Sequence, residues 1–436
     1  MKTGSAKPPR RHQLIMDTGT QRDPETQIFY GYVVVVAAAL ILMVLWAVYY
    51  SFGVFFKPIL SEFGWTRAMT SGAFSLSSIT MGVTGIAIGW VNDRFGPRLV
   101  MSICGVLLGI GYILMSQLST PWQIYLFYGI IVGAGMVGGF VPIMSTLARW
   151  FVKRRGMMTG IVSAGIGLGA VIGPPLANRL ISTYGWRLSY IILGSILLVV
   201  VVLSSQLLKR DPSVVGQVAD GLDQENQIDL SPGSEGFSLG EALYTIPFWL
   251  FFVMIFCFGS CIFSIMVHIA AHSTELGISP AGAAKILATL GGASIAGKLL
   301  LGKLSDIIGS RNIFIFSFLL MAVALFWLVS AKMAWELYCF AGIFGFAYGG
   351  CVTVESPMVA FLFGLRSHGS ILGVVAFGFT IGGAFGPWLT GHIFDVTHSY
   401  QVAFLACAIL SSFGLILTTA LRPKAFHETN HRPLSG

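Results

Sequence analysis

The chain has 436 residues, of which 55% are hydrophobic and only 10% are charged. A typical soluble domain carries about 25% charged residues. With a mean hydropathy of +0.80, the chain has too few polar side chains to cover a globular surface, so composition excludes a soluble protein and indicates one embedded in lipid. The net charge of +8 does not indicate nucleic-acid binding, because the basic residues lie in short runs between apolar segments, where membrane topology explains them.

The six cysteines lie within apolar stretches without CxxC or Cys/His ligand spacing, which argues against disulfides and against a metal site. The first 29 residues are polar and mixed in charge, so we expect no cleavable signal peptide. A GxGxxG motif at Gly133, Gly135 and Gly138 follows no strand, and close helix packing explains it better than a dinucleotide site. We expect no cofactor, and no nucleophile–base arrangement indicates an enzyme.

Apolar runs of roughly 20 residues, the length that spans a bilayer, follow one another along the chain. The first six runs cover 30–56, 68–90, 97–117, 121–147, 157–178 and 187–208. The second six cover 247–272, 281–302, 312–331, 336–361, 369–390 and 401–421. The sequence therefore predicts an all-α membrane protein with twelve transmembrane helices in two six-helix bundles.

The chain is predicted to have five parts. They are an N-terminal arm (1–29), a first bundle (30–208), a linker (209–246), a second bundle (247–421) and a C-terminal tail (422–436). Most lysines and arginines fall in the arm, the linker, the tail and the loops on the same side. Positive charge favours the cytoplasmic side, so we expect both termini in the cytoplasm and a multi-pass protein of the plasma (inner) membrane.

The two bundles repeat each other. The loop after the second helix carries Gly89, Asp93, Gly96 and Arg98, and the loop after the eighth carries Gly302, Asp306, Gly309 and Arg311 at one constant offset. The same offset relates the glycines and Gly-Pro of the fifth and eleventh helices. A constant offset over several helices indicates duplication. Two repeated halves place a substrate site between them and work by rocking of one half against the other.

The GxxxDRxGxR pattern after the second helix, with its degenerate copy after the eighth, resembles the signature of the major facilitator superfamily. The resemblance covers the whole chain and implies twelve helices and alternating access. It implies that Asp93, with Arg94, and its copy Asp306 form a conformational latch, in which the aspartate lies against a helix N-terminus of the other bundle. Pro97 stands where the family usually has a basic residue.

Within that superfamily the chain resembles the monocarboxylate transporter group, which includes the oxalate–formate exchangers. The segments GVFFKPILSEFGWTR (53–67) and RWFVKRRGMMTGIVSAGIGLG (149–169) carry this likeness. The resemblance implies Lys298 as the cation that binds the carboxylate, with Tyr50 as a hydrogen-bond donor and with Phe140 and Tyr348 in the aromatic wall. Ordinary apolar packing is the alternative for the aromatic residues, and a lysine reaching the membrane surface is the alternative for Lys298.

The family's coupling scheme does not transfer intact, because Ser294 stands where animal members carry an aspartate and Tyr50 where they carry a lysine. Two other ionisable residues are candidates for proton coupling. Glu355 lies in an apolar run, and His268 lies near the outer end of the seventh helix. Counting helical rise from the outer ends places Lys298 and Glu355 at the same depth, so we expect them to pair in the absence of substrate.

The sequence thus predicts a secondary active transporter of small monocarboxylates such as lactate, pyruvate or acetate, coupled to a proton as a symporter. Its partners are then a carboxylate anion, a proton and the lipid bilayer, with no nucleic acid and no obligatory protein partner. A proton-independent carboxylate exchanger is the alternative within transport. A transporter-like carboxylate sensor is disfavoured, because the linker and tails are short and featureless.

Overall fold

The computed structural model describes residues 29–221 and 236–421. Apart from two short helices in the linker, the described chain forms two groups of helices. The first group comprises α1 (Gly31–Tyr50), α2 (Phe52–Phe63), α3 (Arg67–Phe95), α4 (Pro97–Met115), α5 (Pro121–Ile124), the π-helical η2 (Tyr125–Val132), α6 (Gly133–Met136), η3 (Val137–Gly139), α7 (Val141–Trp150) and α8 (Arg155–Ser205). The second comprises α10 (Ile246–Glu275), α11 (Pro280–Ile308), α12 (Ser310–Ser330), α13 (Ala334–Phe363), α14 (His368–Thr397) and α15 (Tyr400–Ala420).

Within the described residues, 11 helices are long and apolar enough to cross a membrane. One of them, α8, has 51 residues and is roughly 75 Å long at about 1.5 Å per residue, far more than the ~30 Å of a bilayer core. Gly185, with φ +78° and ψ 163°, interrupts its helical geometry. It therefore forms two spans, and the prediction of an all-α membrane protein with twelve transmembrane helices is confirmed.

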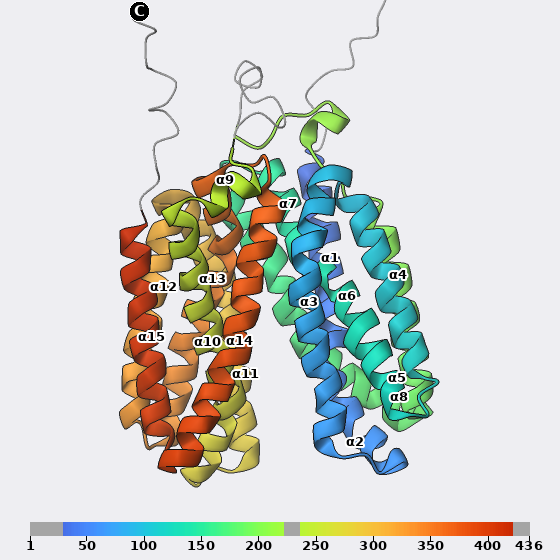
Figure 1. The fold of residues 1–436 in the computed structure, drawn as a ribbon, viewed down its shortest axis with the longest axis vertical. Coiled ribbons are helices and arrows are strands. Elements are labelled where there is room, and N and C mark those ends of the chain that lie inside the picture. Colours follow the sequence, from blue (N-terminus) through green and yellow to red (C-terminus); the bar gives the residue numbers. More distant parts are fainter. Residues whose placement is uncertain (1–28, 222–235, 422–436) are drawn as a thin grey trace, which may run out of the picture.

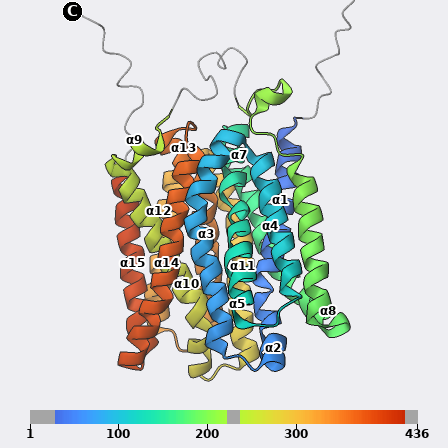
Figure 2. The same cartoon turned by 45° about the vertical axis from the view of Figure 1, so that its right-hand side comes forward.

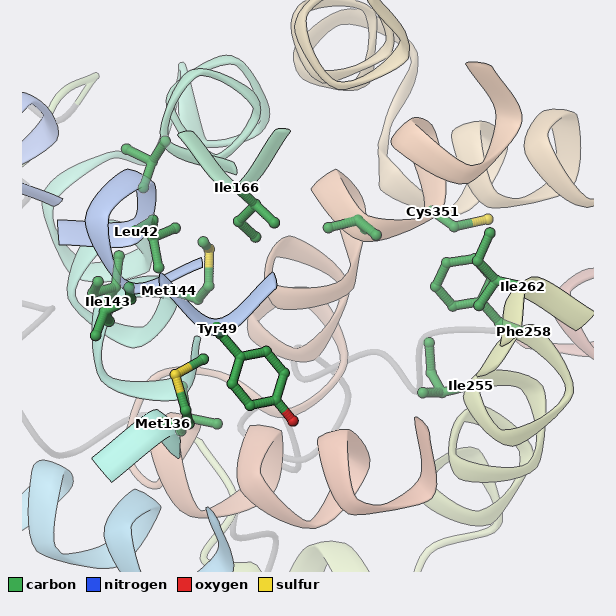
Figure 3. Packing of buried hydrophobic residues seen from close by; sticks show 14 of the residues in the cluster. Leu42, Tyr49, Met136, Ile143, Met144, Ile166, Ile255, Phe258, Ile262 and Cys351 are labelled. Atoms are coloured by element: carbon green, nitrogen blue, oxygen red, sulfur yellow. The ribbon is translucent and has the colours of Figure 1, made fainter. Parts of the chain in front are cut away.

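The two groups stand side by side as separate bundles (Figures 1 and 2). α1 begins and α15 ends at the same end of the molecule, where the linker helices η4 (Pro212–Val215) and α9 (Leu239–Leu243) also lie; we call this the linker end and the opposite one the far end. The predicted arm (1–29) and tail (422–436) lie almost wholly outside the described residues. Figure 3 shows that each bundle has its own buried apolar side chains, such as Leu42 and Ile166 in the first and Phe258 and Cys351 in the second.

The first predicted helix, 30–56, is interrupted at Ser51, between α1 and α2. The last carbonyls of a helix have no partner further along it. Here the Ser51 N–H reaches back to the Val48 and Tyr49 carbonyls, and hydroxyl groups from segments distant in sequence add further partners. Tyr112 donates to the Val48 carbonyl at 3.1 Å, and Tyr128 donates to the Tyr49 carbonyl at 3.5 Å. The tyrosine hydroxyls of other helices thus help to stabilise the break in this helix.

The fourth predicted helix, 121–147, is also interrupted. Phe140 has the non-helical angles φ −148° and ψ −68° and separates η3 from α7. Pro142 follows it and has no N–H to donate back into the preceding turn. The indole N–H of Trp46 donates to the Gly139 carbonyl at 3.3 Å. A side chain of α1 therefore satisfies a backbone group that this break leaves free.

The described parts of the linker pair with one loop in each bundle. Asp220 forms a bridge with Phe151, just before α8, and its carbonyl accepts the Val152 N–H at 3.1 Å. Gly236 forms a bridge with Gly364, just before α14. Phe151 and Gly364 are equivalent positions of the duplication. Each end of the linker is therefore fixed next to the N-terminus of an equivalent helix.

Candidate functional site

Lys298 lies on α11 at the junction of the two bundles. Its backbone carbonyl approaches Gly160 of α8 so closely that a Cβ at Gly160 would collide with it. The Thr353 hydroxyl of α13 donates to the Gly349 carbonyl at 2.9 Å and lies 3.4 Å from the Lys298 carbonyl. The lysine is 1% exposed, so its side chain does not reach the membrane surface.

Among the described residues, the ammonium group of Lys298 has no acidic partner. Its Nζ lies 5.5 Å from the centroid of the Tyr348 ring, and no carboxylate among the described residues lies within 4.0 Å of it. A lysine inside a membrane helix costs about 2.5–3.5 kcal/mol even on the lenient scale, whereas a cation–π contact returns about 0.5–2 kcal/mol. The contact with the Tyr348 ring is therefore too weak to offset the cost of burying the lysine charge. A bound anion would offset it.

Tyr50 is the last residue of α1 in the first bundle. Its side chain is 38% exposed, and its ring lies 5.2 Å from that of Trp46. Of the four predicted substrate residues, the structure brings Lys298 and Tyr348 into contact. The part of Tyr50 in the same site stays a prediction.

Phe140, the fourth, is partly buried and lies at the break in the fourth helix. In the described part of the chain no ring contact joins it to Tyr50 or Tyr348. Its neighbour Gly139 is bonded to Trp46, which in turn contacts Tyr50. Sequence reasoning missed Trp46, although its place one turn before Tyr50 put both side chains on one helical face.

Asp93 lies across the bundle junction from α3, at the N-terminus of α14. Its carboxylate accepts the N–H groups of Gly369 at 3.0 Å and Ser370 at 2.8 Å, and the Ser370 hydroxyl at 2.9 Å. Gly89, one turn earlier, packs against the Gly369 backbone with no room for a side chain. A negative charge is favoured at a helix N-terminus, so this contact fastens the first bundle to the second.

Asp306 makes the equivalent contact in the opposite direction. It accepts the N–H groups of Gly156 at 2.6 Å and Met157 at 2.8 Å, at the N-terminus of α8. The linker end is thus closed by two related contacts, one from each bundle.

Arg94 takes no part in these contacts, contrary to the prediction. Its guanidinium group lies 5.6 Å from the rings of Trp90 and of Phe95, because the residue after Asp93 points to another side of the helix. The arginine that lies beside Asp93 is Arg149 of α7. It lies 3.6 Å from Asp93 and 3.5 Å from Asp211, and it donates to the Leu365 carbonyl of the second bundle at 2.9 Å.

Glu355 does not pair with Lys298, so that expectation is wrong. Tyr348, which the Lys298 ammonium contacts, shares a face of α13 with Glu355 but lies seven residues, or about 10 Å, nearer the far end. The Lys298 side chain leans towards the start of its helix, to Tyr348 and away from Glu355. Glu355 is 4% exposed, and within the described chain its Oε1 has no hydrogen-bond partner.

His268 lies inside the second bundle rather than between the bundles. Its Nε2 is 3.1 Å from the Pro387 carbonyl of α14, and its Nδ1 is 3.4 Å from the Tyr400 hydroxyl of α15. The carbonyl can only accept, so Nε2 carries a hydrogen and Nδ1 is left to the tyrosine. Both ring nitrogens are therefore occupied.

Comparison with known proteins agrees with this architecture. A family model described as Major Facilitator Superfamily matches residues 38–292 and 265–434. The chain belongs to the major facilitator superfamily. Members of this superfamily with solved structures include the human organic anion transporter MFSD10, which aligns with a TM-score of 0.69 at 15% identity over 89% of this chain and 99% of that chain. FucP in its outward conformation aligns with a TM-score of 0.69 at 16% identity, again over 89% of this chain and 99% of that chain.

Curated relatives within the superfamily are more similar in sequence. The chain is 27% identical over 399 residues to the Bos taurus protein named monocarboxylate transporter 13, with 89% of each chain covered. It is 26% identical over 373 residues to the Gallus gallus protein named monocarboxylate transporter 4, over 84% of this chain and 77% of the relative. The predicted family resemblance is confirmed: this major facilitator protein is a transporter, not an enzyme.

Proposed function

We propose that this transporter carries small monocarboxylates, of the size of lactate, pyruvate and acetate, together with a proton. The observation that carries the proposal is the Lys298 ammonium, which is buried at the bundle junction without an acidic partner in the described chain. The names of the relatives, monocarboxylate transporters 13 and 4, support the same substrate class.

The substrate carboxylate binds the Lys298 ammonium, and the hydroxyls of Tyr348 and Tyr50 donate hydrogen bonds to its oxygens from opposite bundles. Such hydrogen bonds to a charged group contribute about 1.5–3 kcal/mol each. Lysine offers a point charge without the planar fork of arginine. We therefore expect the site to tolerate several monocarboxylates rather than to demand one carboxylate geometry.

Alternating access follows from the two closed contacts at the linker end. We infer from the excess of basic residues there that this end lies in the cytoplasm, which makes the described conformation outward-facing. The return step breaks the charge-assisted bonds of Asp93 and Asp306 at helix N-termini, and rocking of the bundles then opens Lys298 to the cytoplasm. Asp93 and Asp306 are the latch residues of this cycle, with Arg149 in place of Arg94.

Glu355 is the proton carrier in this scheme. A buried carboxylate without a cationic partner is costly, so the neutral acid is the stable form in the outward-facing state. Glu355 lies on α13 two turns after Tyr348, the residue that lies against Lys298. A proton on Glu355 and an anion on Lys298 make an electroneutral load, and opening towards the cytoplasm hydrates and releases both.

Uptake into proteoliposomes tests this function. Purified protein is reconstituted, and accumulation of labelled lactate, pyruvate and acetate is followed with and without a proton gradient directed into the vesicles (acidic outside). Accumulation above equilibrium only with the gradient supports the symporter. Exchange that ignores the gradient would instead assign a proton-independent exchanger, and the absence of any carboxylate flux would refute the substrate class.

A further inference from the structure

A pocket with charged lining residues lies at the linker end, away from Lys298. It has a volume of 390 Å³ and lies where the loop before α8 meets the α11–α12 turn and α13. The charged residues of its lining are Lys153 and Arg155 of the first bundle and Asp306 and Arg311 of the second. Both bundles therefore build it.

The pocket carries an excess of positive charge. The Asp306 carboxylate is already bonded to the N–H groups of Gly156 and Met157. Arg155 uses Nε and one terminal nitrogen to hold the Phe151 and Ala148 carbonyls, and Arg311 likewise holds those of Thr418 and Thr419. No side chain caps the start of α12 beside them. Three cations and one carboxylate thus line the pocket, and each oxygen of that carboxylate already accepts a backbone N–H.

The pocket also meets the membrane. α8 begins at Arg155, α11 ends at Ile308 and α12 begins at Ser310, so the basic residues lie where apolar spans end and lipid headgroups begin. Apolar side chains complete the lining, and Ile308 is 41% and Phe361 55% exposed. A ligand with an anionic head and an apolar tail matches this combination, whereas a soluble anion would leave the apolar rim unused.

We propose that this pocket binds the headgroup phosphate of an anionic phospholipid from the cytoplasmic leaflet. Lys153, Arg155 and Arg311 hold the phosphate, and the acyl chains lie along Ile308 and Phe361. Because residues of both bundles line the pocket, it exists in this form only while the linker end is closed. A bound lipid therefore stabilises the outward-facing state by mass action.

The test measures binding to the purified full-length protein, independently of transport. A fluorescent phosphatidylglycerol is displaced by short-chain phosphatidylglycerol, by short-chain phosphatidylcholine or by inorganic phosphate. The Lys153→Gln variant removes one charge from an exposed side chain that makes no ion pair or hydrogen bond with the described residues. Lys303→Gln, an exposed lysine of α11 outside the lining, is the matched control, and Arg311→Gln provides a second lining variant.

We expect saturable displacement by phosphatidylglycerol and at least tenfold weaker displacement by phosphatidylcholine and by phosphate. A basic residue near an anionic headgroup contributes about 1 kcal/mol, so Lys153→Gln should weaken binding about fivefold while Lys303→Gln leaves it unchanged. Equal competition by phosphatidylcholine, or equal affinities of the Lys153→Gln and Lys303→Gln variants, would overturn the site. Phosphate binding as tightly as phosphatidylglycerol would overturn the lipid assignment.

Discussion

The backbone of Lys298 lies directly against Gly160 of the other bundle, and this contact has a copy on the opposite side of the duplication. There Gly373 of the second bundle packs against Gly85 of the first, and both residues are offset from Lys298 and Gly160 by the constant spacing of the repeat. The two contacts differ in one respect: the first bundle has Gly85 at the position equivalent to Lys298 of the second. At this pair of equivalent positions, the symmetric scaffold thus carries a charge on one side only.

The first prediction concerns this close approach. Gly160→Ala places a methyl group against the Lys298 carbonyl and should force the bundles apart at the linker end. Strain of this kind costs about 1–3 kcal/mol, so we expect transport to fall about tenfold and hydrogen exchange at Gly156 and Met157 to speed up. Gly342→Ala is the control, because a Cβ there meets nothing within 4 Å. Unchanged exchange at Gly156 and Met157 would show that the contact does not limit closure.

The second prediction concerns the latch. Asp93→Asn and Arg149→Gln should slow turnover about tenfold, because each loses charge-assisted bonds worth about 1.5–3 kcal/mol, while substrate affinity stays the same. Arg94→Gln should leave turnover unchanged, since Arg94 contacts only exposed rings. Single-turnover kinetics combined with equilibrium substrate binding separate the two quantities. A large loss of affinity in Asp93→Asn would place Asp93 in the substrate site instead.

Much of this fold is predictable because its signals are local. Apolar runs long enough to span a bilayer and a motif repeated at constant offset need no knowledge of packing, and they give the twelve helices and the positions of Asp93 and Asp306. The break at Phe140 had a local signal too, in the glycines before it and in Pro142. The break at Ser51 had none, because hydroxyls of Tyr112 and Tyr128 from distant segments stabilise it.

Side-chain partners across helices were less predictable. Helical rise placed Lys298 and Glu355 at one level, but it counts backbone positions, and the long Lys298 side chain extends towards the start of its helix and ends at Tyr348 instead. In the sequence, Arg149 is one of several basic residues near the ends of helices. Its role in the latch becomes visible in the structure, where it contacts Asp93, Asp211 and the Leu365 carbonyl.

The third prediction concerns proton coupling. Glu355→Gln keeps a neutral side chain of the same size, so exchange of substrate for substrate should persist while accumulation driven by a pH gradient is lost. Glu275→Gln, an exposed carboxylate at the end of α10, should keep both activities. If Glu355→Gln still accumulates substrate when a pH step is applied, Glu355 is not the proton carrier and His268→Gln should be measured next.

The fourth prediction concerns Trp46. Trp46→Phe keeps an aromatic ring near Tyr50 but removes the hydrogen bond to the Gly139 carbonyl. A hydrogen bond of this kind contributes about 1 kcal/mol, so the apparent substrate affinity should fall roughly fivefold through a misplaced Tyr50, with the maximal rate much less affected. Uptake measured over a range of substrate concentrations distinguishes the two effects, and an affinity equal to that of the wild type would contradict this positioning role.

The central claim is that the Lys298 ammonium is the counter-charge of the substrate carboxylate. Equilibrium binding of labelled lactate, pyruvate and acetate to purified wild-type, Lys298→Ala and Lys298→Arg proteins tests it most directly, with Lys285→Ala, an exposed lysine of the same helix, as the control. Losing a charge-assisted bond of about 1.5–3 kcal/mol predicts at least tenfold weaker binding in Lys298→Ala, partial retention in Lys298→Arg and no change in Lys285→Ala. Wild-type affinity in a folded Lys298→Ala protein would contradict the account.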